Sequence, residues 1–179
     1  MKYLPTIVVQ RFSHIDFDKL YSENIRIILT DLDNTLIDYF VKEPTEELIR
    51  LNEYLHKKGF KIYIISNNSK KRIERFIKKF KVEGYLAKAS KPWKTKVNKY
   101  LKKNNIDKKE TIFIGDQLLT DIKCANKVGI KSILVRSVSR KSEKWYTRLN
   151  RMREIFVMKK IKKVDPKIYL EIERLNKNE

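Results

Sequence analysis

The sequence predicts an α/β fold, a Rossmann-like three-layer sandwich in which helices cover both faces of a mostly parallel sheet. Five short apolar runs rich in branched residues alternate with segments whose apolar residues recur at helical spacing. This alternation requires crossovers between parallel strands, and such crossovers are right-handed. Polar side chains follow several of the runs, where α/β sheets bind their ligands.

Each predicted strand is a short, mostly apolar run bounded by polar or turn-forming residues. The predicted strands are residues 26–30, 61–65, 84–87, 111–114 and 132–135. Pro44, followed by acidic residues, marks the start of the first helix, and Gly59 marks its end. The next three helices are expected to begin near Ser69, Pro92 and Gln117.

The chain is 179 residues long, which suits one domain with a buried core. We expect an N-terminal arm at residues 1–24 that packs on the domain, a catalytic core at 25–136, and a basic helical extension at 137–179. No apolar run is long enough to span a bilayer, and the first residues do not resemble a secretion signal. The expected location is therefore cytoplasmic.

The composition is strongly basic, with 42 Lys and Arg against 22 Asp and Glu and a formal charge of +20. Such a balance favours polyanionic partners, either nucleic acid or an anionic lipid surface, and charge alone does not choose between them. Lysines that merely solvate helix faces are the alternative. Cys124 is the only cysteine, which excludes an intramolecular disulfide and a thiolate metal cluster.

Two carboxylates, Asp31 and Asp33, follow the first predicted strand. Side chains two residues apart on an extended backbone point to the same side, so both are expected to face one small volume. One carboxylate can attack a substrate while its neighbour transfers a proton. The alternative is that both only cap a turn.

Three further strand ends carry groups that suit a phosphoryl site: Ser66-Asn67-Asn68, Lys91-Pro92, and the stretch from Gly115-Asp116 to Asp121. A hydroxyl and backbone N–H groups bind phosphate oxygens, and a lysine supplies a compact positive charge. An additional carboxylate completes an oxygen-rich site for Mg²⁺. Each group alone is a weak signal, but their order after separate strands predicts one shared site.

These four motifs resemble those of the haloacid dehalogenase (HAD) superfamily of phosphatases. The resemblance implies a HAD-like fold in which Asp31 attacks phosphorus to form an aspartyl-phosphate, and Asp33 protonates the leaving oxygen and then activates water. It also implies that Ser66, Asn67 and Lys91 bind the transferring phosphate.

The same resemblance implies that Mg²⁺ is the cofactor, held by Asp31, the backbone carbonyl of Asp33, and Asp116. The place of Asp121 in its motif suits either of two roles: it binds the metal itself, or it supports the residues that do. Many relatives insert a cap domain, but residues 36–60 and 68–90 leave no room for one. The expected site is open, as in class III members, and suits a large or anchored substrate.

A closer resemblance is to the YqeG-like subfamily, class IIIA, and the related phosphatidylglycerophosphatases. It depends on the stretches 31–36, 66–68 and 115–122, and on a downstream signature at 147–151. It implies dephosphorylation of phosphatidylglycerophosphate to phosphatidylglycerol, a step of phospholipid metabolism. The implied partner is an anionic phospholipid at the inner face of the membrane.

The extension offers separate support for membrane contact. Residues 136–163 contain eleven Lys or Arg against two acids, Glu143 and Glu154. An apolar stripe beside them is expected to lie in a bilayer interface. Its residues are Trp145, Leu149, Met152 and Phe156. The alternative is that this stripe packs as ordinary core.

Two other functions stay open at this point. One is a phosphatase of nucleotides or nucleic-acid termini, with the Lys-rich segments 70–81 and 88–103 on backbone phosphates. The other is a non-catalytic RNA- or ribosome-associated protein. No recognised nucleic-acid module supports either, and the intact motifs favour an enzyme.

Overall fold

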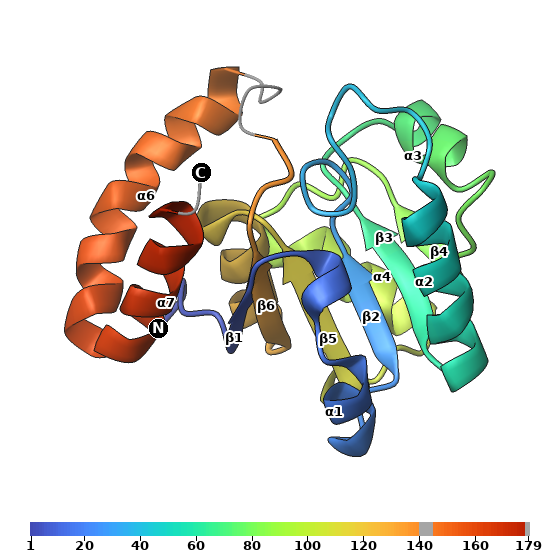
Figure 1. The fold of residues 1–179 in the computed structure, drawn as a ribbon, viewed down its shortest axis with the longest axis horizontal. Helices are drawn as coiled ribbons and strands as arrows, with labels where there is room; N and C mark the ends of the chain where they lie inside the picture. The colour runs from blue at the N-terminus through green and yellow to red at the C-terminus, as the bar shows by residue number, and fades with distance from the viewer. Residues whose placement is uncertain (140–144, 178–179) are drawn as a thin grey trace.

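The computed structural model describes residues 1–139 and 145–177, with the backbone alone for residues 145–152. Six strands form one sheet in the order β1-β6-β5-β2-β3-β4, and every neighbouring pair is parallel. The strands are β1 (Ile7–Val9), β2 (Ile27–Thr30), β3 (Lys61–Ile65), β4 (Gly84–Leu86), β5 (Thr111–Gly115) and β6 (Lys131–Val135). The predicted α/β class with a parallel sheet is confirmed (Figure 1).

The sixth strand, β1, is the one that the sequence patterns do not predict. It lies inside the expected N-terminal arm and pairs with the last strand, with Ile7 opposite Ile133. Its three residues are only half-buried, because β1 forms an edge of the sheet. The run is apolar but only three residues long, which is too short for its pattern to indicate a strand.

The helices follow the predicted order, with additional ones in the arm and the extension. They are α1 (Phe17–Ser22), α2 (Glu46–Lys58), α3 (Lys70–Phe76), α4 (Lys94–Lys103), α5 (Lys123–Val128), α6 (Trp145–Val164) and α7 (Pro166–Lys177). Short turns of other helix types are η1 (Phe12–His14), η2 (Lys108–Glu110) and η3 (Leu118–Ile122), the last with π-helical bonding. The hydroxyls of Thr45 and Ser69 cap α2 and α3, and Gly59 ends α2 in the left-handed conformation at φ 100°.

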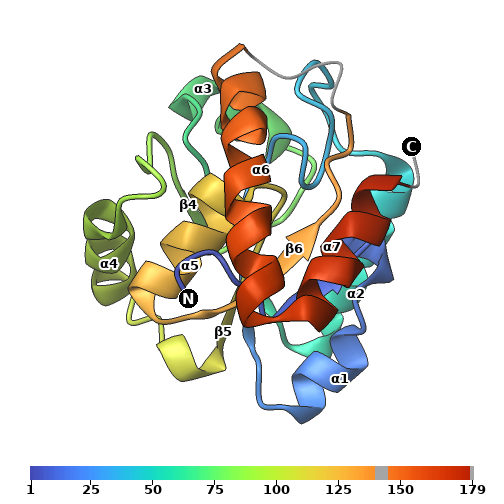
Figure 2. The same cartoon turned by 90° about the vertical axis from the view of Figure 1, so that its left-hand side faces the viewer.

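The sheet separates two apolar layers because successive strand residues point to opposite faces. Ile28 packs with the arm, α2 and α3, whereas Leu29 packs with α4 and α5. A third apolar cluster joins η3 and β6 to α6 and α7, and Leu134 supplies its sheet residue. Figure 2 shows α6 and α7 as a pair lying beside α5 near the β6 side of the sheet.

The predicted tail therefore contains two helices that pack on the domain. In α6, Val157 and Ile161 are buried, whereas Phe156 of the predicted stripe is 67% exposed. Its other members, Trp145, Leu149 and Met152, lie outside the residues whose side chains are described, as does the signature at 147–151.

No cap domain is inserted at either position where relatives carry one. Residues 36–60 form a loop and α2, and residues 68–90 form α3, β4 and their connections. Within the described residues, no helix combines the length and the apolar character needed to cross a bilayer.

Candidate active site

The carboxyl ends of the inner strands bring together most of the predicted site residues. Asp31 directly follows β2, Ser66 follows β3, and Asp116 follows β5. Because β2 lies between β3 and β5, the three residues meet along one edge of the sheet. Lys91, in the loop after β4, reaches the same place through its side chain.

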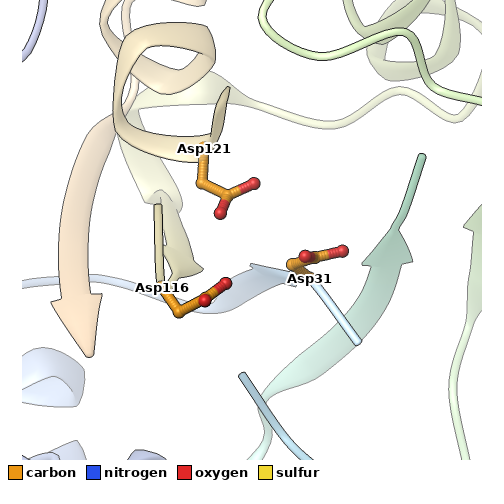
Figure 3. A group of neighbouring side chains, drawn as sticks. All are labelled: Asp31, Asp116 and Asp121. Atoms are coloured by element: carbon orange, nitrogen blue, oxygen red, sulfur yellow. The ribbon is translucent and has the colours of Figure 1, made fainter. Parts of the chain in front are cut away.

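Three buried carboxylates form the centre of this edge. Asp31, Asp116 and Asp121 each offer an oxygen that lies within 4.8 Å of the others. Figure 3 shows Asp31 at the end of β2, Asp116 after β5 and Asp121 on η3, with their carboxylates around a common space. Clustered carboxylate oxygens are the donors that Mg²⁺ prefers, so the residues fit this ion.

Gly115 allows Asp121 to reach the cluster. A Cβ at this position would lie 2.3 Å from the Cβ of Asp121, too close for any side chain. The π-helical turn η3 then folds back over the end of β5, and the Gln117 N–H donates to Asp121 Oδ2 at 3.1 Å. The glycine thus places the two carboxylates of this motif side by side.

Lys91 is the cation of the cluster. Its Nζ lies 2.9 Å from Asp31 Oδ1 and 2.7 Å from Asp121 Oδ1, and Lys91 is 5% exposed. Asn67 fixes its backbone, since the Asn67 amide donates to the Lys91 carbonyl at 3.0 Å and accepts from the Lys91 N–H at 2.7 Å. The Asn67 side chain is therefore committed to Lys91, and its predicted contact with phosphate stays a prediction.

Burial and charge set the protonation of this cluster. Burial raises the pKa of Asp31 to about 6, although nearby Lys91 acts to lower it. Burial also acts against the charge of Lys91, but Asp121 and Asp31 outweigh it and hold the pKa of Lys91 above its ordinary value. The pKa of Lys91 and the pKa of Asp31 thus both lie above their ordinary values, for opposite reasons: neighbouring carboxylates favour the charge of Lys91, and burial disfavours the charge of Asp31.

Asp33 lies beside the buried cluster, on the side of α3. Its Oδ1 accepts from Arg72 Nε at 3.0 Å and its Oδ2 accepts from Asn68 Nδ2 at 2.9 Å. Asp33 is not among the three clustered carboxylates of the described residues. Asp31 and Asp33 thus have different partners, Lys91 for the first and Arg72 with Asn68 for the second. The expectation that both face one small volume stays a prediction.

Two hydroxyls complete the site. Ser66 is 2% exposed, and its Oγ accepts from the Asn68 N–H at 3.1 Å. Thr35 donates its hydroxyl to Asp116 Oδ1 at 3.3 Å. Asn34, directly before Thr35, adopts the left-handed conformation with φ 64°, and the chain turns there.

Sequence reasoning missed two residues that act on the site. Arg72, which holds Asp33, sits in a segment crowded with lysines and arginines, so no local signal distinguishes it. Glu154 of α6 accepts hydrogen bonds from the backbone of η3. The signal for Glu154 was available, because it is a rare acid in a strongly basic stretch.

A cavity of about 360 Å³ adjoins the site between β6 and the two C-terminal helices. Asp116 and Arg136 line it, together with apolar side chains such as Leu134, Met158 and Ile172. Of the three clustered carboxylates, Asp116 thus borders a cavity with both polar and apolar walls.

Comparison with known proteins agrees with this geometry. The sequence family described as "Haloacid dehalogenase-like hydrolase" matches residues 39–135, just over half of the chain. The chain is 34% identical over 161 residues to "Probable phosphatase YqeG" of Bacillus subtilis (strain 168), which covers 90% of this chain and 92% of that protein.

Solved structures share the fold at lower identity. The D,D-heptose 1.7-bisphosphate phosphatase from B. bronchiseptica, complexed with magnesium and phosphate, is 16% identical with a TM-score of 0.53, over 66% of this chain and 85% of that one. An uncharacterized protein from Listeria monocytogenes serotype 4b is 22% identical with a TM-score of 0.51, over 65% and 84%. Sequence and fold together identify the chain as a phosphatase that belongs to the haloacid dehalogenase-like hydrolases.

Proposed function

We propose that this phosphatase hydrolyses phosphate monoesters in a Mg²⁺-dependent reaction through an aspartyl-phosphate on Asp31. The observation that carries this proposal is the convergence of Asp31, Asp116 and Asp121 with Lys91 at the carboxyl ends of parallel strands. A phosphate monoester is an anion, so a nucleophilic carboxylate reaches it only where positive charge offsets the repulsion.

The chemistry divides into two displacements at phosphorus. An oxygen of Asp31 bonds to phosphorus while the bond to the leaving alcohol breaks, and Asp33 gives its proton to that alcohol oxygen. A water molecule then attacks the aspartyl-phosphate and loses a proton to Asp33. Inorganic phosphate leaves, and both carboxyl groups return to their starting states.

The surrounding residues bind charge during both steps. Ser66 donates its hydroxyl to a phosphate oxygen, and Lys91, positioned by Asn67, offsets the negative charge. Mg²⁺, held by Asp31, the Asp33 backbone carbonyl and Asp116, would supply further positive charge next to phosphorus. Asp121 keeps Lys91 in place and lies close enough to support the metal ligands.

A trapping experiment tests the intermediate directly. Wild-type protein is incubated with Mg²⁺ and a ³²P-labelled phosphate monoester and quenched in acid. We expect a label on the peptide that contains Asp31, and none in Asp31→Asn. Turnover that proceeds at the wild-type rate in Asp31→Asn would remove Asp31 from the mechanism.

For the substrate we propose phosphatidylglycerophosphate, presented by a membrane. The absence of a cap leaves the site open to an anchored substrate. Large apolar side chains are exposed on loops at the carboxyl end of the sheet, namely Phe40 at 72% and Val41 at 41% after β2 and Val138 at 52% after β6. Exposed Lys42 stands next to the first pair. Apolar tips beside cations suit contact with an anionic bilayer.

The outer face of α6 has the same character. Ile155 and Phe156 are 59% and 67% exposed, and cations flank them. The exposed cations of this stretch are Arg153, Lys159 and Lys160. Each Lys or Arg close to anionic lipid contributes about 1 kcal/mol, so a few are enough for reversible binding.

A phosphate-release screen decides the substrate. Phosphatidylglycerophosphate in vesicles is compared with nucleotides, phosphopeptides and oligonucleotides phosphorylated at the 3′ or 5′ end, each with and without Mg²⁺. We expect Mg²⁺-dependent release confined to the lipid, with Asp31→Asn as the inactive control. Release mainly from nucleotides or oligonucleotides would overturn the lipid assignment and leave the phosphatase chemistry intact.

Vesicle flotation tests the membrane surface separately. Removing the extension would expose its buried cluster, so surface substitutions are the better probe. We expect F156S combined with K159E and K160E to reduce flotation with anionic vesicles by at least ~10-fold, since two cationic contributions near 1 kcal/mol each are reversed and an exposed apolar side chain is removed. The matched control, K57E on α2, should float like wild type.

A further inference from the structure

Glu154 turns inward from α6 toward the catalytic centre. It is 9% exposed, although cations flank it along the same helix. Its Oε1 accepts hydrogen bonds from the backbone N–H groups of Leu118 at 2.8 Å and Leu119 at 3.3 Å. The C-terminal extension thus supplies an acceptor to the turn that separates Asp116 from Asp121.

This turn has no internal acceptors for its first amides. The first N–H groups of any helical turn lack partners within the turn, and η3 is only five residues long. The Gln117 N–H is bonded to Asp121, and the next two N–H groups are bonded to Glu154. Two carboxylates, one local and one from α6, therefore fix the start of η3.

The apolar packing of α6 against η3 involves other side chains than Glu154, so packing alone does not account for the hydrogen bonds of the Glu154 carboxylate. Val157, which directly follows the exposed Phe156, lies in the apolar cluster that contains Leu118 of η3. The helix is therefore attached to η3 in two ways, through an apolar side chain and through a charged acceptor. Substitutions can remove one attachment and keep the other.

We propose that Glu154 is a positioning residue for the metal-binding carboxylates, holding the backbone between Asp116 and Asp121 so that both face Asp31. The proposal rests on the Mg²⁺-dependent function proposed above. Residues that orient metal ligands from behind change metal affinity by ~10- to 100-fold when they are lost. The C-terminal extension is then part of the catalytic centre and not only a surface attached to it.

Calorimetric titration of the whole chain with Mg²⁺ in the absence of substrate tests this role. We expect Glu154→Ala to weaken Mg²⁺ binding by ~10-fold or more, and Glu154→Gln, which keeps a carbonyl acceptor, to retain most of it. Two controls separate packing from positioning. Val157→Ala should lower the melting temperature without changing Mg²⁺ affinity, and Glu171→Ala, at an exposed acid of α7, should change neither.

Hydrogen exchange gives a readout that is independent of metal. The amides of Leu118 and Leu119 should exchange faster in Glu154→Ala and stay protected in Val157→Ala. Unchanged Mg²⁺ affinity in Glu154→Ala, or an equal loss in Val157→Ala, would overturn the positioning role. Wild-type protein that binds no Mg²⁺ would instead refute the proposed metal site, and the role of Glu154 would fall with it.

Discussion

The carboxyl edge of the inner strands and the C-terminal helix pair use charge in opposite ways. At the strand edge the charged groups are buried and closely paired, as with Lys91 between Asp31 and Asp121. In the helix pair the buried positions are mainly apolar, such as Ile161 and Ile172, and the cations face outward. The net charge of +20 is therefore a property of the surface, whereas the candidate site contains a few compensated charges that are buried.

The largest expected effect lies at the strand edge. Asp31→Asn should lower turnover by at least ~10⁴-fold, because loss of the proposed nucleophile removes the covalent route. The chain should stay folded, since the substitution removes a charge that burial already disfavours. Steady-state rates together with circular dichroism check both expectations, and an unfolded variant would contradict the second.

The next effect concerns stability at the same edge. Lys91→Met leaves two buried carboxylates without their cation and should cost about 3–5 kcal/mol of unfolding free energy. Mg²⁺ should restore part of this loss, because the proposed metal site includes Asp31 and adjoins Asp121. Urea denaturation with and without Mg²⁺ measures the difference. A variant as stable as wild type would show that the lysine is not needed to compensate the cluster.

A pair of substitutions in α6 tests the two sides of the helix. Ile161→Ala should destabilise the chain by about 2–4 kcal/mol, because its side chain is fully buried. Phe156→Ala, on the exposed side, should change stability by no more than about 0.5 kcal/mol. Thermal melts compare the two variants. Equal losses would show that both faces of α6 are packed in solution.

The smallest effect is the titration of Cys124. Burial raises the pKa of this thiol to about 11, from 9.0 in its ordinary state. The unfolded thiol ionises first, so its contribution to stability is complete below pH 9 and is lost as the pH rises toward 11. Melting temperatures of wild type and Cys124→Ala should therefore converge slightly over this range. Parallel curves would contradict the assignment.

Burial explains which parts of the fold the sequence patterns could predict. All five predicted strands match their bounds to within one residue, and in the four inner ones runs such as Ile112–Ile114 are buried and apolar throughout. The edge strand β1 offers only a three-residue apolar run inside the expected arm. The turn η3, predicted as the start of an ordinary helix, has π-helical bonding, and its Asp121 lies close against Gly115.

The candidate site was predictable where residues follow strands, and not where distant segments supply the partners. Asp31, Ser66 and Asp116 converge because parallel strands end together. Arg72 reaches Asp33 across 39 residues, and Glu154 reaches Leu118 across 36. The rarity of acids around Glu154 marks that residue but not its partner, and nothing local marks Arg72, since both pairings depend on how whole helices pack.

The pairing of β1 with β6 also has a consequence for synthesis of the chain. Ile7 meets Ile133 only after more than a hundred further residues have been made. Until then β1 has unpaired backbone groups on the side that later joins β6, and such groups are prone to pair with other chains. The sheet therefore closes on its β1 side only after Val135 has been made, late in the synthesis of the described domain.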